Sequence, residues 1–264
     1  MVEESPFLWI GFADPPDMSK KYNLSRPPCP MLCPSKRMID EKMRGSMSTA
    51  MTVGIIVFDG VLTSEVVAPA EVFATAAGQS WGAGIRVCLI GVDPRQQQIR
   101  TEEGLRLGVD ATVADDLPCD VLLVPGANDM APLIDNAALR AYIERHHQGG
   151  QWLGSVCAGA FLLGAAGALD GRQATTWFGG EARLQERYPA AQVVIDQPVV
   201  FDRRLVTANG GLVSYSAALA LLGRLAGAER AREVYEALGL DRMLGWDALS
   251  QAIAQPEAAE QAAR

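Results

Sequence analysis

The stretch QWLGSVCAG, residues 151–159, decides the fold of this chain. Its first six residues form an apolar run that is predicted to be a strand, and a helix-like segment at residues 158–166 follows without a linker. A residue at such a sharp turn is often strained, and Gly159 leaves room for close packing of the strand and the helix. Cys157 therefore occupies the position of a nucleophile at a strand-to-helix junction.

Outward from this junction, strand-like and helix-like segments alternate along the chain, which predicts an α/β fold with a doubly wound, mostly parallel sheet and helices on both faces. Ligands bind such sheets beyond the carboxyl ends of the strands, so we expect the chemistry at the strand-to-helix junctions. The predicted strands are residues 52–58, 85–90, 121–124, 151–156, 193–195, 199–201 and 205–207. The predicted helices are residues 69–77, 136–148, 158–166, 212–225 and 229–238.

The position of Cys157 predicts a reactive thiol. The unpaired N–H groups and the dipole at the start of a helix favour a thiolate, so the thiol pKa is expected below the ordinary value of about 8.5. The alternative is that Cys157 is a small buried hydrophobe, because free cysteine is among the most buried residue types.

A second junction follows the first predicted strand, at residues 59–65. Pro69 biases the preceding residue away from helical geometry, so Glu65 is expected in a turn that points into the crevice. A carboxyl group beside a thiolate should have a raised pKa and could donate a proton to it. The alternative is an ordinary solvated carboxylate at the start of a helix.

A third junction, VPGAN at residues 124–128, opens from a strand into a loop. Gly126 permits a tight backbone turn, and the N–H groups of Gly126, Ala127 and Ala158 could together form an oxyanion or anion pocket. A plain turn explains the same residues equally well.

Composition and charge exclude several classes of protein. The chain has 264 residues, is 49% hydrophobic and carries a formal net charge of −8. It has neither the roughly 20 consecutive apolar residues of a membrane helix nor the order of a signal peptide, so no membrane association is expected. The acidic charge and scattered arginines disfavour direct nucleic-acid binding. An odd number of cysteines favours a reducing cytoplasm over a disulfide framework.

The first fifty residues have a different composition from the rest. They contain all four lysines, and their Pro-rich runs lack helical or strand periodicity, so residues 1–50 are predicted to be a disordered leader or a misassigned start. Residues 51–243 form the predicted domain, and residues 244–264 a C-terminal tail. Cys29 and Cys33 form a C-x3-C pair without a second pair or a nearby histidine, so no metal site is expected.

Several segments together resemble the ThiJ/PfpI superfamily, within the class I glutamine amidotransferase-like fold. They are VFDGVLTSEVVAPAEVF, DVLLVPGAND, SVCAGAFLLGAAGALDGRQATTW, PVVFDRRLVTANGG and YSAALALLGRLAG, and the resemblance covers residues 51–243. It is nearest to isonitrile hydratases and to the sensor domains of AraC-type regulators. The resemblance implies a flavodoxin-like fold in which Cys157 is the elbow cysteine, Glu65 its acidic partner, and Gly126 and Ala127 the Gly-Gly turn.

Histidines are missing where hydrolytic relatives carry them. Proteolytic members of the superfamily place histidine directly after the cysteine, where this chain has Ala158, and many relatives have histidine where it has Trp177. The two histidines present, His146 and His147, end the helix before the elbow strand and are expected far from Cys157. A Cys-His base pair for amide or peptide hydrolysis is therefore not expected.

The resemblance implies an isonitrile hydratase-like enzyme, in which the Cys157 thiolate attacks a small electrophile and Glu65 donates and accepts the proton. Trp177 and Phe178 are expected to form an apolar pocket wall. The alternative is a non-catalytic ligand or redox sensor without direct nucleic-acid binding, and glyoxalase or deglycase chemistry is a third possibility. Relatives are usually homodimers, so a homodimer is expected, and no metal or organic cofactor is implied.

Overall fold

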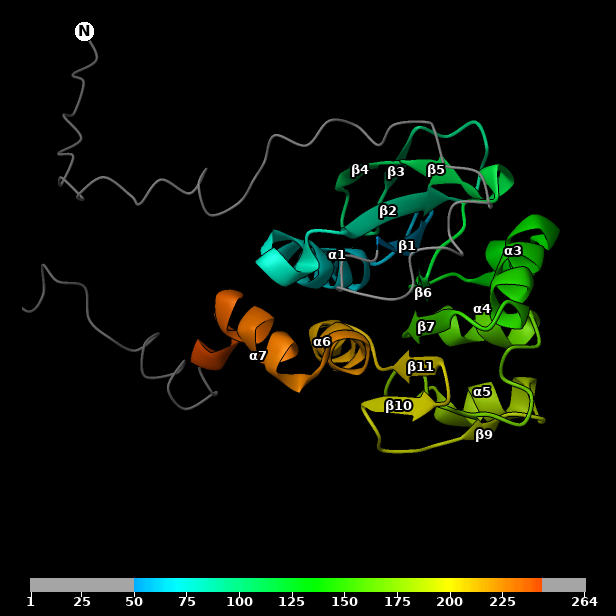
Figure 1. The fold of residues 1–264 in the computed structure, drawn as a ribbon. Coiled ribbons are helices and arrows are strands. Elements are labelled where there is room, and N and C mark those ends of the chain that lie inside the picture. Colours follow the sequence, from blue (N-terminus) through cyan, green and yellow to red (C-terminus); the bar gives the residue numbers. More distant parts are fainter. Residues whose placement is uncertain (1–49, 244–264) are drawn as a thin grey trace, which may run out of the picture. The chain divides into compact units, whose positions relative to one another are not determined.

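The computed structural model describes residues 50–243 (Figure 1). The predicted tail, and the predicted leader except Ala50, lie outside the described residues, as do Cys29 and Cys33. The described residues form a seven-stranded sheet in the order β10-β11-β7-β6-β1-β2-β5. All neighbouring pairs are parallel except β10 with β11. The strands are β1 (Met51–Val57), β2 (Ile85–Gly91), β5 (Ala111–Thr112), β6 (Val121–Val124), β7 (Trp152–Val156), β10 (Val199–Asp202) and β11 (Leu205–Ala208).

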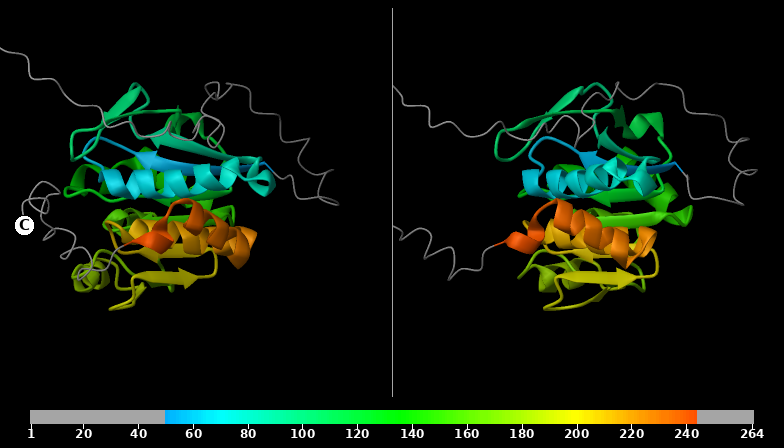
Figure 2. Two further views of the ribbon diagram at one scale, coloured as in Figure 1. Left: turned by 90° about the vertical axis from the view of Figure 1, so that its left-hand side faces the viewer. Right: turned by 60° about the vertical axis from the view of Figure 1, so that its left-hand side comes forward.

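Helices cover both faces of this sheet, so the predicted doubly wound α/β fold is confirmed (Figure 1). One face carries α1 (Thr63–Gly78), α6 (Val213–Ala226) and α7 (Ala228–Ala237), which lie in front of the sheet in Figure 2. The other carries α2 (Ala131–Ile134), α3 (Ala137–Gln148), α4 (Gly159–Ala165) and α5 (Glu181–Arg187).

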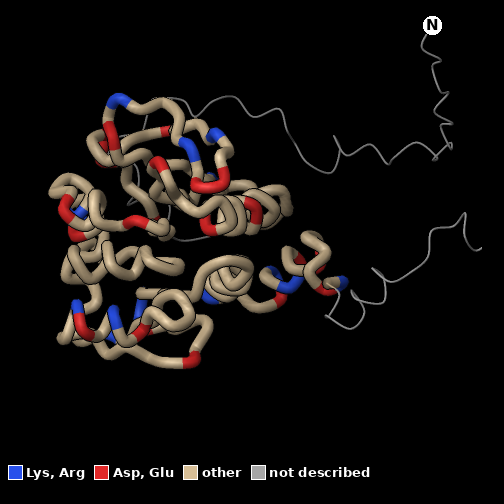
Figure 3. Tube along the Cα trace, turned by 180° about the vertical axis from the view of Figure 1, so that it is seen from behind, with Lys and Arg blue, Asp and Glu red and all other residues tan. Residues whose placement is uncertain are grey.

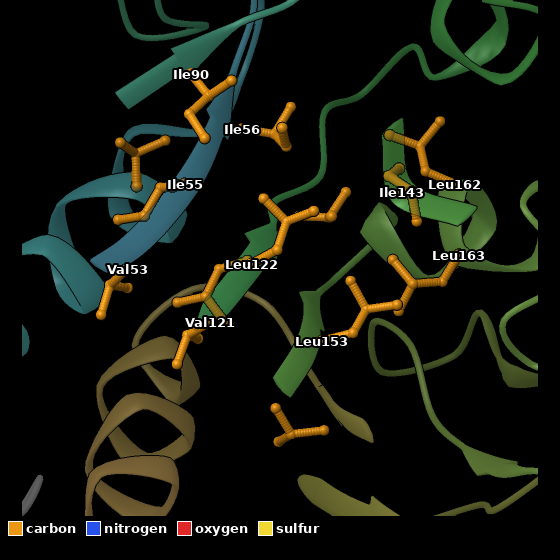
Figure 4. Packing of buried hydrophobic residues seen from close by; sticks show 14 of the residues in the cluster. Val53, Ile55, Ile56, Ile90, Val121, Leu122, Ile143, Leu153, Leu162 and Leu163 are labelled. Carbon is orange, nitrogen blue, oxygen red and sulfur yellow. The ribbon is translucent and has the colours of Figure 1, made fainter. Parts of the chain in front are cut away.

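The central strands β1 and β6 are buried on both faces. Alternate side chains of β1 therefore both enter the core, and Ile55 and Ile56 are each fully buried although they point to opposite faces. Figure 4 shows these residues with Leu122 of β6, Leu153 of β7 and Leu162 of α4. Continuous runs of branched apolar residues were thus the correct signal for buried parallel strands.

The predicted start of the first helix at Pro69, with Glu65 in a turn before it, is wrong. Helix α1 runs from Thr63 through Pro69, so Glu65 lies in its first turn and not in a loop before it. Proline lacks only its own N–H, so it forgoes a single bond to the carbonyl of Glu65. Pro69 is itself buried, so packing of the helix compensates for the missing bond.

Several short elements were not predicted from the sequence, because two to four residues give too little periodicity to recognise. The two-stranded sheets are β3 (Gln98–Arg100) with β4 (Arg106–Gly108), and β8 (Gln173–Ala174) with β9 (Gln192–Val193). Of these four strands only β9 overlaps a predicted one, residues 193–195, which it meets at Val193. The 3₁₀ turns are η3 (Ser80–Gly82), η4 (Val113–Asp115) and η5 (Leu240–Arg242). Across residues 50–243, every helix is too short or too polar to span a bilayer.

Candidate active site

Cys157 links the end of β7 to the start of α4 in a strained backbone conformation. Its φ is +54°, in the left-handed region that non-glycine residues rarely adopt. Its N–H donates to the carbonyl of Ala208 at the end of β11, at 2.9 Å. Such strain persists only where the surroundings impose it, and it is common at functional sites. The predicted sharp turn at the elbow is confirmed.

Two glycines allow the chain to pack against this elbow. A Cβ on Gly159 would lie 2.0 Å from the carbonyl oxygen of Val124, and one on Gly126 would lie 2.7 Å from the nitrogen of Ala158. Both distances are far below any real contact of a Cβ atom, so only glycine fits at these two positions. The end of β6 and the start of α4 therefore touch backbone to backbone, as the sequence predicted for Gly159.

Thr176 and Asn209 hold the elbow from a different part of the chain. The Thr176 hydroxyl donates to the carbonyl of Cys157 at 2.7 Å, and the side-chain amide of Asn209 donates to the carbonyl of Thr176. Thr176 is fully buried. These positioning residues were not predicted from the sequence, because the contacts span 19 and 33 positions in the chain.

We expect Thr176→Val to loosen the elbow. The carbonyl of Cys157 would lose the nearer of its two donors and keep only the N–H of Ala160 at 3.4 Å, which costs about 1 kcal/mol of the free energy of unfolding. Urea denaturation and the rate at which iodoacetamide modifies Cys157 would measure this effect, and Thr176→Ser should restore both. Thr175→Val is the matched control, because the adjacent Thr175 hydroxyl is fully buried without a hydrogen-bond partner among the described residues. Equal effects of the two valine substitutions would contradict the role given to Thr176.

Glu65 is a buried carboxyl group that faces the thiol. Only 1% of the residue is exposed, and its Oε2 accepts a hydrogen bond from the N–H of Gly126 at 2.7 Å. Its Oε1 faces Cys157 beside the backbone of Gly210: a Cβ on Gly210 would lie 2.6 Å from Glu65 Oε1 and 3.0 Å from Cys157 Sγ. The structure thus brings Glu65 and Cys157 together, as predicted, and adds Gly210 as the residue that keeps space for the pair.

The acid–base properties of this pair differ from those predicted for the thiol. Burial, followed by the charge of Glu65, raises the pKa of Cys157 to about 12, although the N–H of Ala158 acts in the opposite direction. The predicted lowering of the thiol pKa is therefore wrong, because burial outweighs the helix terminus. Burial also raises the pKa of Glu65. That direction was predicted, but burial and not the neighbouring thiolate is its main cause.

Two acids that face each other in a buried site do not ionise together at neutral pH. At most one of the two groups is therefore ionised, and the reactive form is the one in which Glu65 carries the charge and Cys157 the proton; the titration belongs to the pair and not to either group. Attack by the sulfur can then proceed with transfer of the thiol proton to Glu65. This arrangement needs no histidine and no thiolate formed in advance.

The raised pKa of Glu65 predicts how stability depends on pH. Between its unfolded value of 4.5 and its raised folded value, the folded protein holds a proton that the unfolded chain has lost. The stabilising contribution is full below pH 4.5 and is lost as the pH rises through the folded pKa. We therefore expect the free energy of unfolding of the wild type, relative to Glu65→Gln, to fall as the pH rises above 4.5. Parallel urea titrations would measure it, and identical pH slopes would contradict the assignment.

The oxyanion pocket predicted from three N–H groups needs correction. The N–H of Gly126 donates to Glu65, and that of Ala127 donates to the sulfur of Met130 at 3.1 Å. Both donors are thus occupied, and Gly126 orients the carboxyl group. Of the three, only the N–H of Ala158 faces the sulfur of Cys157, where it can stabilise negative charge.

A cavity of about 860 Å³ opens onto Cys157, with Ala127 and Ala158 among its lining residues. Trp177 lines it as predicted and stacks on Phe161, with ring centroids 5.3 Å apart and an angle of 26° between the rings. Phe178 does not line the cavity and is 78% exposed, which corrects its predicted role as a wall. A cavity of this volume matches the size of ordinary small-molecule sites.

Both histidines lie at the opposite end of β7 from Cys157. His146 is buried with its Nε2 atom 2.9 Å from the carbonyl oxygen of Trp152, the first residue of that strand. The five residues of β7 separate the Trp152 end of the strand from Cys157, which places the two about 15 Å apart. Burial lowers the pKa of His146 and of His147. The predicted distance between the histidines and the elbow is confirmed.

The other described cysteines lie away from this cavity. Cys88 and Cys119 are buried, and burial raises the pKa of Cys119 to about 11. Within residues 50–243, no three side chains of histidine, cysteine, aspartate or glutamate are grouped as a metal site requires.

A model of the DJ-1/PfpI family matches residues 51–222, which include the elbow and Glu65. The chain belongs to the DJ-1/PfpI family. Isonitrile hydratase of Pseudomonas putida is 28% identical over 70% of this chain and 76% of its own length. The transcriptional regulator ArgR of Pseudomonas aeruginosa is 32% identical over 54% of this chain but only 42% of its own length.

Solved structures of DJ-1/PfpI proteins share the fold described above. DJ-1beta of Drosophila melanogaster superposes with a TM-score of 0.64 and 22% identity, over 72% of this chain and 98% of that protein. At this level of identity the likeness is one of fold, which confirms the predicted architecture. Chemistry has to be argued from the site.

Proposed function

We propose that this DJ-1/PfpI protein is a cysteine-dependent enzyme that adds water to a small electrophilic molecule, with isonitriles as the first candidates. The observation that carries the proposal is the strained elbow of Cys157, which faces the buried carboxyl group of Glu65 at a cavity of about 860 Å³. The similarity to an isonitrile hydratase over 70% of the chain supports the choice of substrate class.

In the first half of the reaction, the isonitrile becomes covalently bound. The Cys157 thiol transfers its proton to Glu65 as the sulfur attacks the terminal carbon, and Glu65 passes that proton to the same carbon. One S–C bond and one C–H bond form, and the product is a thioimidate, R–N=CH–S–Cys157. The Ala158 N–H, which faces the sulfur, stabilises the negative charge that develops there as the thiol proton leaves.

In the second half, water releases the product. Glu65 takes a proton from a water molecule while the water oxygen attacks the thioimidate carbon. Glu65 then gives this proton to the thioimidate nitrogen. The tetrahedral adduct then collapses, so that the C–S bond breaks and the hydroxyl proton returns to sulfur. The net reaction converts R–NC and water to the formamide R–NH–CHO. The enzyme is regenerated with the proton on the Cys157–Glu65 pair.

A panel of three electrophiles tests this function. We expect the wild type to convert cyclohexyl isocyanide to N-cyclohexylformamide and to leave a peptide substrate intact, since no histidine lies near the thiol. Glu65→Gln should lower the rate about 10²–10⁴-fold, which is the usual worth of a positioned acid–base group. Gas chromatography would measure the formamide. Full activity of Glu65→Gln would contradict this mechanism, and turnover of methylglyoxal alone would favour glyoxalase chemistry instead.

A ligand sensor is the second candidate, favoured by the 32% identity with a transcriptional regulator. In that case the cavity would bind the electrophile or an analogue without turning it over. Isothermal titration calorimetry with the same three compounds separates the two functions. Saturable binding without any product would replace the enzyme with a sensor.

A further inference from the structure

The cavity at Cys157 has apolar and charged walls. The charged residues come from two different elements, with Arg183, Glu186 and Arg187 on α5, and Asp129 and Asp135 around α2. Figure 3 shows basic and acidic segments together in the region of α5, at the lower left. The apolar side chains that line the same cavity are Leu62, Met130, Ile134, Phe161 and Trp177. A ligand with both an apolar body and a charged group would match these walls.

The two aspartates of this cavity lie at the two ends of α2. Asp129 accepts a hydrogen bond from the N–H of Ala131 at 3.0 Å, so it fixes the first turn of α2. Asp135 lies close enough to the hydroxyl of Tyr188 to raise its pKa. The wall around α2 is therefore acidic, so an anionic ligand group is expected at the opposite wall, on α5.

The two arginines of α5 that line the cavity form no ion pair with the described residues. Among residues 50–243, no carboxylate lies within 4.0 Å of the guanidinium group of Arg183 or of Arg187. Arg187 interacts with the hydroxyl of Tyr188, which in turn donates to the carbonyl of Phe161 at 2.8 Å. Arg187 is thus tied to the cavity wall beside Phe161, and Arg183 lies one helical turn before it.

The negative charge at Cys157 decides where an anionic ligand group can lie. In its reactive form the Cys157–Glu65 pair carries one negative charge, so a carboxylate next to the reacting carbon would be repelled. A carboxylate several bonds away would reach the arginines of α5 and avoid this repulsion. An arginine fork matches a carboxylate, because it can form two parallel hydrogen bonds with it.

From these contacts we propose that the cavity binds small electrophiles that carry a carboxylate group, with Arg183 and Arg187 as its anchor and Trp177 beneath the apolar body. The reacting end of the ligand rests on the proposed function of Cys157. The carboxylate end is a separate property of α5, and it can be tested without turnover.

Three maleimides that differ only in charge provide the test. N-ethylmaleimide is neutral, N-(2-carboxyethyl)maleimide is anionic, and N-(2-aminoethyl)maleimide is cationic. In each case the Cys157 sulfur forms one bond to the ring C=C, and the thiol proton moves to the neighbouring carbon. Peptide mass spectrometry of the full chain at pH 7.5 would give the initial rate at Cys157 and distinguish it from the other cysteines.

We expect the wild type to react faster with the anionic than with the neutral probe, after correction for their rates with free cysteine. The double substitution Arg183→Gln and Arg187→Gln should lower this ratio about five- to tenfold, and Glu186→Gln should raise it. Arg106→Gln is the matched control, because Arg106 is exposed on β4 and does not line the cavity. High salt should reduce the preference by screening.

Three outcomes would overturn the anchor. They are an unchanged ratio in the double variant, a preference for the cationic probe, and no reaction of Cys157 with any probe. Failure of the hydratase proposal would give a different pattern of results from failure of the carboxylate anchor. If no isonitrile is hydrated but the arginine-dependent preference remains, the hydratase proposal fails and the carboxylate site stands.

Discussion

Cys157→Ala should reduce the hydration of cyclohexyl isocyanide to the uncatalysed rate. The sulfur forms the covalent bond in the proposed reaction, and removing a nucleophile that works with its base costs on the order of 10⁶-fold in rate. The rate of Cys157→Ser should be almost as low, because a hydroxyl gives up its proton much less readily than a thiol. Single-turnover assays with chromatographic detection of the formamide would measure both losses. Mass spectrometry of the quenched wild type should also detect the thioimidate.

Cys119→Ala is the control for this experiment. It removes a buried thiol outside the cavity, so we expect a modest loss of stability and full activity. Circular dichroism spectra of the Cys157 variants should match that of the wild type, since the elbow is held by Thr176 and Ala208 through the backbone of residue 157. Turnover that survives in Cys157→Ala would remove the thiol from the mechanism.

Gly159→Ala should be the most destabilising small substitution near the site. Replacing glycine by alanine within an exposed helix usually stabilises it by about 1 kcal/mol. Here the new Cβ would lie 2.0 Å from the carbonyl oxygen of Val124 and 3.0 Å from that of Pro125. These are backbone atoms that cannot rotate away, so β6 and α4 must separate. We expect the free energy of unfolding to fall by about 3 kcal/mol or more, measured by urea denaturation.

Gly78→Ala provides the comparison. Gly78 is exposed at the last position of α1, and a Cβ there would meet nothing within 4 Å. This substitution should leave the free energy of unfolding within about 1 kcal/mol of the wild-type value. If Gly159→Ala behaved like Gly78→Ala, the contact between β6 and α4 would have to be looser than described.

The sequence predicted the principal strands of the sheet to within two residues at each end, because strands buried on both faces consist of unbroken apolar runs. It failed at the start of α1, which was predicted at Pro69 and lies at Thr63. It also missed β3, β4, α5 and β8, whose stability depends on contacts with distant parts of the chain. Local patterns cannot report such contacts.

The residues of the candidate site likewise fall into those that the sequence predicted and those that it did not. Cys157 and Glu65 could be found because a strand, a turn and a helix are local patterns, and both residues stand at such junctions. The exposure of Phe178 and the acceptor of the Gly126 N–H could not be predicted from the sequence. Both depend on contacts between junctions that lie far apart in the chain. Thr176, Asn209 and Gly210 were missed for the same reason, since they act on Cys157 from other elements.

The sequence alone determined the alternation of strands and helices, the elbow cysteine, its acidic partner and the absence of a nearby histidine. Only the tertiary structure decided the protonation of the pair. Helix position predicts a thiol with a lowered pKa, but burial and the facing carboxyl group raise that of Cys157 to about 12. Desolvation depends on what surrounds a group in space, and residues far apart in the sequence supply those surroundings.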